Sequence, residues 1–395
     1  MNLDVRSLRT FSRLAHSGAE KAAGSLTTLA GIDTYVNVTK VELSTKQDVE
    51  QEFDERNLVS VRIGFSGGLD GQTILTFSPE SAERLVEALV PGAEAEPGGE
   101  LATSSLKEVA NIMLGGFIDG WADYLDTSID ITTPTYVDQN TDDPLSELEP
   151  EGFEHDESDE EHILVFRNQL EAADDAIGFA LYMVPSANSI ETIVEASGND
   201  DELPVESFAA FSEMISDGAN QASEDITAMT GIDTTVEVSR LSFVPIEGVP
   251  MSLTDGVRRG VVLEFMGMPS GYIAILFDEP SADSIASALL PGMEGDEAMR
   301  QSAIQEIGNI VTSGFLDGWA NALETTIDIS PPTHVHDLGS AIIDPLATEL
   351  AMSQEYAFLI DSTIRTSNDE FTCDIYALPD ENELRKALEQ LSPAV

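Results

Sequence analysis

The sequence predicts an α+β protein with layered helices and sheet, in which one domain occurs twice in tandem. Each half alternates amphipathic stretches with short runs rich in Val, Ile and Thr, joined by short connections, which favours a mainly antiparallel sheet with long helices packed on it. The halves also share segments: Gly31-Ile32-Asp33-Thr34 returns 200 residues later as Gly231-Ile232-Asp233-Thr234. Similarity at this long period indicates two copies of one domain, not a solenoid of short repeats.

The expected domains are residues 1–198 and 199–395 of the 395-residue chain. The junction is placed near Ser197 to Pro204, where turn-forming and charged residues cluster. A second polar stretch, Ser146 to His162, holds nine acidic residues among seventeen and is expected to be a solvated surface loop. A milder counterpart is expected from Leu346 to Glu355.

The first half opens with an amphipathic helix, Val5 to Leu29, repeated as Val205 to Met229. Three runs rich in β-branched residues follow and are expected to be strands: Thr34 to Leu43, Leu58 to Phe65 and Gln72 to Phe77.

A short helix from Ser81 to Leu89 is expected next, because Pro91-Gly92 ends it. A longer helix is placed from about Ser104 to Leu125, followed by an extended segment around Pro134. Two strands close the half, Ile163 to Leu170 and Ala176 to Val184.

The charge balance is extreme. Asp and Glu total 73 against 18 Lys and Arg, a formal net charge of −55. Such a surface repels itself at low ionic strength, whereas at about 1 M salt the Debye length falls to roughly 3 Å. We therefore expect a protein of a very salty cytoplasm, as in haloarchaea. Disorder is disfavoured by the 42% apolar content, and nucleic-acid binding by the missing basic footprint.

The cysteine count and the hydropathy argue against disulfides, cysteine metal clusters and membrane-spanning segments. Cys373 is the only cysteine, which excludes an internal disulfide and a cysteine metal cluster. No segment reaches about 18 uninterrupted apolar residues and the N-terminus lacks a signal-like apolar region. The expectation is a cytoplasmic protein with no membrane partner.

One polar motif recurs between the halves at an offset of 198 residues. Placed on a helix, its Ser, Glu and Asn fall at i, i+4 and i+7 and form an outward stripe beside a buried apolar one. The simpler alternative is a solvated helix surface with the serines as N-caps. The two copies are Ser104, Glu108, Asn111 and Pro134, and Ser302, Glu306, Asn309 and Pro332.

This motif resembles that of the CheC/CheX/FliY phosphatases of chemotaxis: Asp or Ser, three residues, Glu, two residues, Asn, twenty-two residues, Pro. Both copies match every position, and the resemblance covers most of both halves, with the acidic stretch as an apparent insertion. It implies a CheC-like fold in tandem, with internal pseudo-two-fold symmetry in each half.

That symmetry implies an earlier site on the first helix of each half. Gly18-Ala19-Glu20-Lys21-Ala22-Ala23 resembles the family's Gly-Ala-Gly-Asn-Ala-Ala stretch. Aligned on it, the Glu and Asn positions hold Arg13 and His16 in the first half, and Glu213 and Ser216 in the second. The early sites are therefore expected to be degenerate.

The resemblance implies hydrolysis of the aspartyl phosphate on the response regulator CheY. Asn111 and Asn309 would align the attacking water, and Glu108 and Glu306 would engage the partner's active-site lysine. Ser104, Ser302, Pro134 and Pro332 would shape the helix start and the neighbouring loop. The chain would need no cofactor or metal of its own, because Mg²⁺ sits on CheY.

Three alternatives stay open. The chain could be a non-catalytic adaptor that binds phosphorylated CheY, the deamidase CheD, or both. A flagellar-switch role, as in FliY, is less favoured because no appended switch-binding domain is visible. A metal site at His334 and His336 is disfavoured because no Cys or third His lies nearby in sequence.

Overall fold

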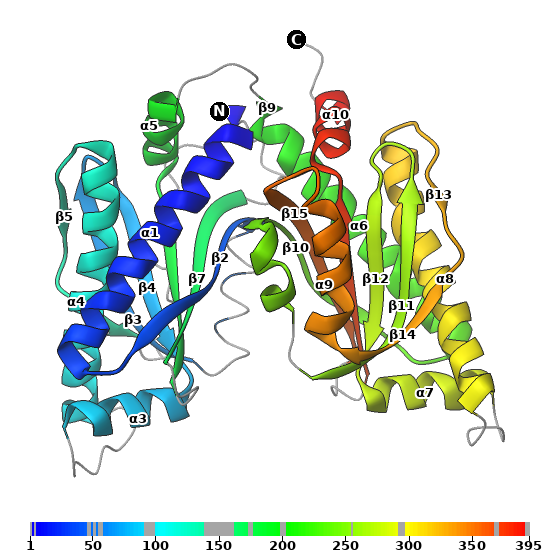
Figure 1. The fold of residues 1–395 in the computed structure, drawn as a ribbon, viewed down its shortest axis with the longest axis horizontal. Coiled ribbons are helices and arrows are strands. Elements are labelled where there is room, and N and C mark those ends of the chain that lie inside the picture. Colours follow the sequence, from blue (N-terminus) through cyan, green and yellow to red (C-terminus); the bar gives the residue numbers. More distant parts are fainter. Residues whose placement is uncertain are drawn as a thin grey trace. The chain divides into compact units, whose positions relative to one another are not determined.

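A computed structural model describes the chain except for residues 1, 4, 46–48, 50–52, 54–57, 91–98, 138–161, 173–176, 198–202, 254–255, 291–296, 367–370 and 392–395. The chain forms two compact units, residues 1–202 (unit 1) and 203–395 (unit 2), which run from blue to green and from green to red in Figure 1. The predicted boundary between residues 198 and 199, and the acidic stretch 146–161, fall outside the described residues.

Unit 1 contains an antiparallel sheet in the order β2-β7-β8-β4-β3, with two short strands, β5 and β6, paired to the outer side of β3. The elements in chain order are β1 (Asn2–Leu3), α1 (Val5–Ala30), β2 (Thr34–Thr45), β3 (Val59–Gly67), β4 (Gly71–Phe77), α3 (Pro79–Leu89), α4 (Glu100–Leu125), β5 (Ile129–Ile131), β6 (Thr135–Val137), β7 (His162–Ala172), β8 (Gly178–Pro185) and α5 (Ala187–Ser197).

Unit 2 repeats the arrangement with the order β10-β15-β16-β12-β11, and β13 and β14 pair with β11. Its elements are β9 (Leu203–Pro204), α6 (Val205–Thr230), β10 (Thr235–Pro245), the 3-10 helices η1 (Ile246–Gly248) and η2 (Pro250–Ser252), β11 (Val257–Met266), β12 (Gly271–Phe277), α7 (Glu279–Leu289), α8 (Glu297–Ala322), β13 (Asp328–Ile329), β14 (Thr333–Leu338), α9 (Gly339–Leu350), β15 (Tyr356–Arg365), β16 (Thr372–Pro379) and α10 (Glu381–Leu391).

The antiparallel sheets and packed helices confirm the α+β prediction. Within the described part of unit 1, a long helix followed by strands and a shorter helix occurs twice: α1, β2 to β4 and α3, and then α4, β5 to β8 and α5. The long helices α1 and α4 open these two series. No helix among the described residues is long and apolar enough to cross a membrane.

Aromatic side chains join the long helices to one face of each sheet. In unit 1, Phe166 of β7 contacts Phe11 of α1 and Trp121 of α4, with ring centroids 5.6 and 4.9 Å apart. In unit 2, Trp319 of α8 contacts Phe265 of β11 and Phe211 of α6, with ring centroids 6.0 and 5.4 Å apart. Alternation along a strand places these rings on a single face of the sheet, so the long helices cover the core and turn their other sides to solvent.

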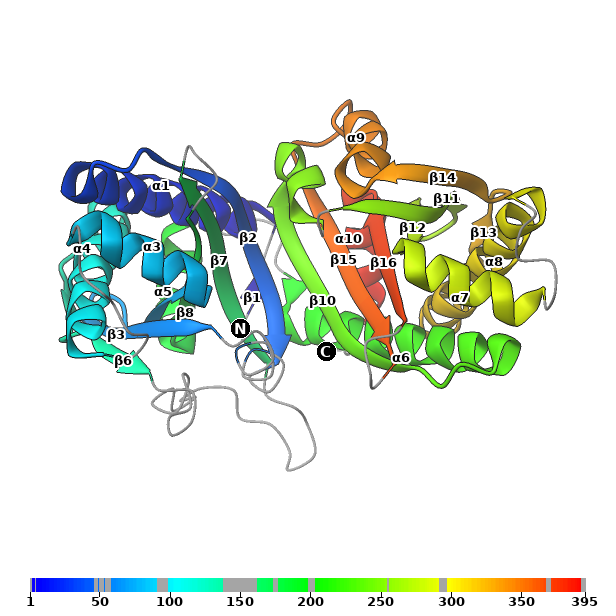
Figure 2. The same cartoon turned by 90° about the horizontal axis from the view of Figure 1, so that it is seen from below.

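The opposite face of the unit 2 sheet is covered by α9 (Figure 2). Ile343 and Leu350 of this helix are buried with Tyr376 and Leu378 of β16. The expected polar loop from Leu346 to Glu355 is therefore wrong over its first part, which is helical. Leu350 falls a full seven residues after Ile343 and so returns to the same buried side of the helix.

Glycines bring α1 and α4 into close contact. A Cβ on Gly18 would lie 2.8 Å from the Phe117 ring, and one on Gly120 would lie 3.0 Å from the Gly18 Cα. Because Lys21 reaches Asp123 while Ser25 lies against Gly116, the two helices run antiparallel. A side chain at this crossing would force the helices apart.

We expect Gly18→Ala to lower the free energy of unfolding by about 1–3 kcal/mol through overpacking. Gly24→Ala on the same helix is the matched control, because its Cβ would meet nothing within 4 Å. In that control variant the free energy of unfolding should rise by about 0.5–1 kcal/mol, because alanine has a higher helix propensity than glycine. Denaturant unfolding in concentrated salt measures both, and equal effects would contradict the close packing.

Unit 2 buries an ion pair where unit 1 has apolar residues. Arg258 Nε lies 3.5 Å from Asp374 Oδ2, and the two side chains are 12% and 5% exposed. The sheet registers place Leu58 and Ala180 at the equivalent positions of unit 1. Burial, reinforced by Asp361, raises the pKa of Asp374 to about 6 despite Arg258.

A carboxyl whose pKa is raised by folding stabilises the protein below its unfolded pKa, and this stabilisation is lost as pH rises through about 6. Replacing the pair with the unit 1 residues, Arg258→Leu with Asp374→Ala, should raise the free energy of unfolding at pH 8 by about 1–4 kcal/mol. Arg258→Leu alone should destabilise at pH 8 and much less at pH 5, where Asp374 is protonated. A pH-independent loss in that single variant would contradict the assignment.

Candidate functional site

The motif helix α4 separates a buried side from an exposed side. The predicted apolar stripe is buried throughout, at Leu106, Val109, Ala110, Met113, Leu114 and Phe117. On the other side, Ser104, Glu108 and Asn111 are exposed. The helical period therefore places the three polar motif residues on one solvent-facing stripe, as the spacing predicts.

The start of this helix differs from the prediction. Helix α4 begins at Glu100, with Gly99 as its N-cap, and α8 begins at Glu297. Ser104 and Ser302 therefore lie inside their helices and cap neither, and their predicted role in shaping the helix start is wrong. In both copies an acidic residue lies in the first turn, where it interacts favourably with the positive end of the helix dipole. Each helix therefore begins about one turn before the motif serine.

The proline of the motif lies in a loop that faces the helix. Pro134 separates β5 from β6, as expected for a residue that cannot donate to a strand ladder. Two residues earlier, Thr132 binds the backbone of Gly64 twice: its N–H donates to the carbonyl at 2.8 Å, and its Oγ1 accepts from the N–H at 2.9 Å. These bonds fix the loop against β3.

Helix and loop together enclose a surface depression of about 530 Å³. Glu108 and Asn111 make no side-chain hydrogen bond or ion pair with any residue that the structure describes, so both are available to a ligand. The depression is lined by Ser104, Lys107, Glu108, Asn111, Ile131, Thr132, Thr133 and Pro134. All four motif residues of unit 1 thus meet at one place.

Unit 2 builds the same arrangement. Ser302 and Glu306 are exposed on α8, and Asn309 is half-buried beside them. Ser330 replaces Thr132 and binds the Glu264 backbone in the same way, at 2.8 and 2.9 Å. Gln305 Nε2 donates to the Pro332 carbonyl at 3.2 Å and joins helix to loop directly.

Motif spacing missed the residues that anchor the loop, Thr132 and Ser330. Their only signal in the sequence is a hydroxyl residue two positions before each proline. The spacing also missed Lys107 and Gln305, one residue before each glutamate, since neither belongs to the Ser-Glu-Asn-Pro pattern.

The first helices lack the Glu and Asn pair, as the sequence shows. In unit 1, Arg13 and His16 are exposed on α1, and His16 lies 3.4 Å from Thr39 Oγ1 and 3.8 Å from Glu20. In unit 2, Glu213 is exposed and Ser216 is half-buried on α6.

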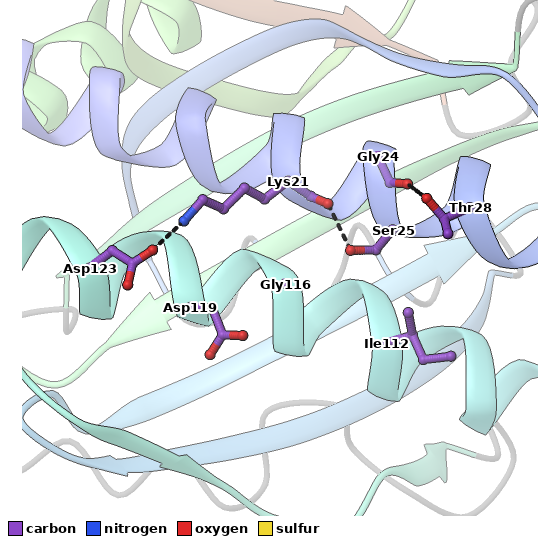
Figure 3. A pocket seen from close by; sticks show the side chains of 8 residues that line it. All are labelled: Lys21, Gly24, Ser25, Thr28, Ile112, Gly116, Asp119 and Asp123. Atoms are coloured by element: carbon purple, nitrogen blue, oxygen red, sulfur yellow. Dashed lines mark hydrogen bonds and ion pairs between the residues drawn. The ribbon is translucent and has the colours of Figure 1, made fainter.

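Because α1 and α4 are antiparallel, Arg13 and His16 lie beyond one end of the helix crossing while Glu108 and Asn111 lie beyond the other. Between them runs a groove whose walls carry Lys21 and Asp123, joined by an ion pair of 2.6 Å (Figure 3).

One of the two histidines on β14, His336, takes part in an ion-pair cluster, and His334 lies nearby. His336 Nε2 lies 2.7 Å from Glu279 Oε1, and Arg259 lies 3.4 Å from His336 Nδ1 and also contacts Glu297. Partial burial, together with the nearby Arg259 and His336, lowers the pKa of His334. Within the described part of the chain no group of three His, Cys, Asp or Glu side chains is placed to hold a metal ion.

The arrangement offers a carboxylate and a carboxamide side by side at an open depression. A carboxamide can both donate to and accept from a water molecule, and a carboxylate can pair with a lysine of a docked protein. Ser104 lines the same depression as Glu108, but the two side chains are not joined by a hydrogen bond that would activate the hydroxyl. The site therefore suits positioning chemistry better than nucleophilic chemistry.

The chain is similar in sequence to known proteins. The sequence profile of the CheC-like family matches residues 299–336, and that of the chemotaxis phosphatase CheX matches residues 59–144. The chain is 31% identical over 186 residues to the CheC1 protein of Halobacterium salinarum, covering 45% of this chain and 92% of that protein. It is 40% identical over 81 residues to the CheY-P phosphatase CheX of Thermotoga maritima, covering 20% of this chain and 51% of that protein. The crystal structure of Thermotoga maritima FliY overlaps 49% of this chain and 97% of its own, with 20% identity and a TM-score of 0.39.

Proposed function

Since the chain belongs to the CheC-like family of chemotaxis proteins, we propose that it hydrolyses the aspartyl phosphate of a CheY response regulator. The relative from Thermotoga maritima bears the name CheY-P phosphatase. The relative from Halobacterium salinarum accords with the haloarchaeal origin expected from the net charge.

The observation that carries the proposal is the meeting of Glu108, Asn111 and Pro134 at one depression, with both polar side chains unpaired among the described residues. The same residue types recur on α8 with the same anchored loop. A helix surface without a function has no need to keep a carboxylate, an amide and a fixed loop together in both units.

In the proposed reaction Asn111, or Asn309 in unit 2, holds a water molecule in line with the phosphorus atom of the docked partner. The water oxygen forms a bond to phosphorus while the bond from phosphorus to the aspartyl oxygen breaks. The electron pair of that bond stays on the aspartyl carboxylate, and both protons of the water leave with inorganic phosphate. Phosphoryl transfer depends chiefly on positioning and charge stabilisation, so this chain needs to supply little besides the amide.

The glutamates are assigned to docking. Glu108 and Glu306 are exposed one helical turn from the asparagines, and a carboxylate there would pair with the active-site lysine of CheY. Mg²⁺ bound to CheY would neutralise charge on the phosphoryl group, so no metal of this chain is involved.

The proposal is tested by the decay of phosphorylated CheY in concentrated salt, followed as released inorganic phosphate, with and without this protein. Faster decay with the protein is the expected result. Equal decay with and without it would contradict the phosphatase function.

A second candidate function is an adaptor that binds phosphorylated CheY, the deamidase CheD, or both, without catalysis. The observation that favours it is the replacement of the pair by Arg13 and His16 on α1, and the loss of Asn from the pair on α6. In the same experiment an adaptor would bind phosphorylated CheY but leave its decay unchanged.

A further inference from the structure

The two motif sites differ at one charged position. Lys107 lines the unit 1 depression together with Glu108 and Asn111. At the offset of 198 residues that relates the two motifs, unit 2 has Gln305 in its place. A positive charge next to a bound phosphoryl dianion affects the rate of its hydrolysis. The exchange of Lys107 for Gln305 should therefore make the two sites differ in rate.

Helix geometry places Lys107 beside the water-positioning residue. Lys107 and Asn111 are four residues apart and therefore neighbours on one face of α4. In unit 2 the same pair of positions holds Gln305 and Asn309, and Gln305 reaches the Pro332 carbonyl across the site. Lys107 lines the equivalent depression in unit 1, so the position belongs to the site in both units.

Lys107 is also unusual in its electrostatic state. The chain has only 18 basic residues against 73 acidic ones, yet the half-buried Lys107 makes no hydrogen bond or ion pair with any residue that the structure describes. Elsewhere, Lys21 is paired with Asp123 and Lys386 with Glu383. An ammonium group kept unpaired in a depression is suited to receive an anion from a partner.

We propose that Lys107 contacts the phosphoryl oxygens of the docked aspartyl phosphate and makes the unit 1 site the faster of the two. This inference rests on the proposed function. Charge on the phosphoryl oxygens must be stabilised as water attacks, and a nearby ammonium does so at short range where salt screens least. Gln305 instead stabilises the loop of unit 2 and adds no charge.

The test isolates unit 1 by Asn309→Ala and then replaces Lys107 with the unit 2 residue, glutamine. We expect Lys107→Gln to lower phosphate release from phosphorylated CheY about tenfold in this background. This is less than the roughly 10²–10³ typical of a buried charge-stabilising contact, because solvent reaches the site. Lys107→Arg should retain most of the rate. Lys21→Gln is the matched control, because it also exchanges a unit 1 lysine for its unit 2 equivalent, Gln221, and it should leave the rate unchanged.

A binding measurement separates contact with the phosphoryl group from a structural role. Lys107→Gln should weaken binding to CheY carrying beryllofluoride and Mg²⁺, an acyl-phosphate mimic, and leave binding to untreated CheY unchanged. Equal weakening of both would overturn the proposed contact, as would an unchanged release rate in an otherwise active Asn309→Ala protein. Absence of release from both the wild type and Asn309→Ala would contradict the proposed function itself, and the role of Lys107 with it.

Discussion

Replacing Asn111 and Asn309 together by alanine is expected to lower the phosphatase rate by about 10²–10³, the usual loss when a group that aligns or stabilises a reacting centre is removed. Each single replacement should leave the phosphatase activity of the other unit intact, because the two sites lie in separate units. With Lys107 active, Asn111→Ala should cause the larger of the two single losses. Released phosphate, measured at saturating phosphorylated CheY in concentrated salt, gives all four rates.

Asn321→Ala provides the control for these variants. Asn321 is exposed near the C-terminal end of α8, far along the helix from Asn309. Its replacement removes the same amide from the same helix and should change neither rate nor folding. A comparable loss in Asn321→Ala would show that the effect of the double variant does not come from the site.

Transfer to low salt is expected to unfold the protein. With a net charge of −55, repulsion reaches across each unit at about 0.01 M salt, where the Debye length is roughly 30 Å, and almost vanishes at about 1 M. Circular dichroism during stepwise dialysis should show loss of helix and strand signal.

Restoring the salt should restore the spectrum, because screening of the same charges then returns. Complete retention of the folded spectrum at about 0.01 M salt would contradict the halophilic interpretation. Sodium and potassium chloride should act alike at equal ionic strength, since screening depends on ionic strength and not on the identity of the cation.

The long periodic elements could be predicted from sequence to within a few residues. Helix α1 was expected at Val5 to Leu29 and spans Val5–Ala30. The third strand was expected at Gln72 to Phe77 and spans Gly71–Phe77. A period of 3.6 or 2 carried over many residues identifies the buried face whatever the tertiary context.

The short helices α5, α9 and α10 escaped prediction. Helix α9 contains Pro345, an unfavourable residue inside a helix, and several polar residues. It is stabilised by burying Ile343 and Leu350 against the second face of the sheet. That stabilisation is tertiary and leaves little trace in a short window of sequence.

For the site, spacing located the outward stripe of Glu108 and Asn111 but not what surrounds it. The hydrogen bonds between Thr132 and Gly64 join residues 68 positions apart. The sequence around Thr132 therefore does not predict them. The place of Lys107 in the lining of the depression likewise depends on where the loop packs. The chemical character of the site could be predicted from the motif, whereas the position of the loop beside it could be seen only in the folded structure.

The central claim is that helix-borne asparagines align the water that cleaves the aspartyl phosphate. The most direct test uses one preparation of the double variant Asn111→Ala, Asn309→Ala. Two quantities are measured on it: phosphate release from phosphorylated CheY, and binding to CheY carrying beryllofluoride and Mg²⁺. The account predicts that the double variant binds nearly as well as the wild type but accelerates phosphate release about 10²–10³ times less. A double variant that binds and still releases phosphate at the wild-type rate would contradict it.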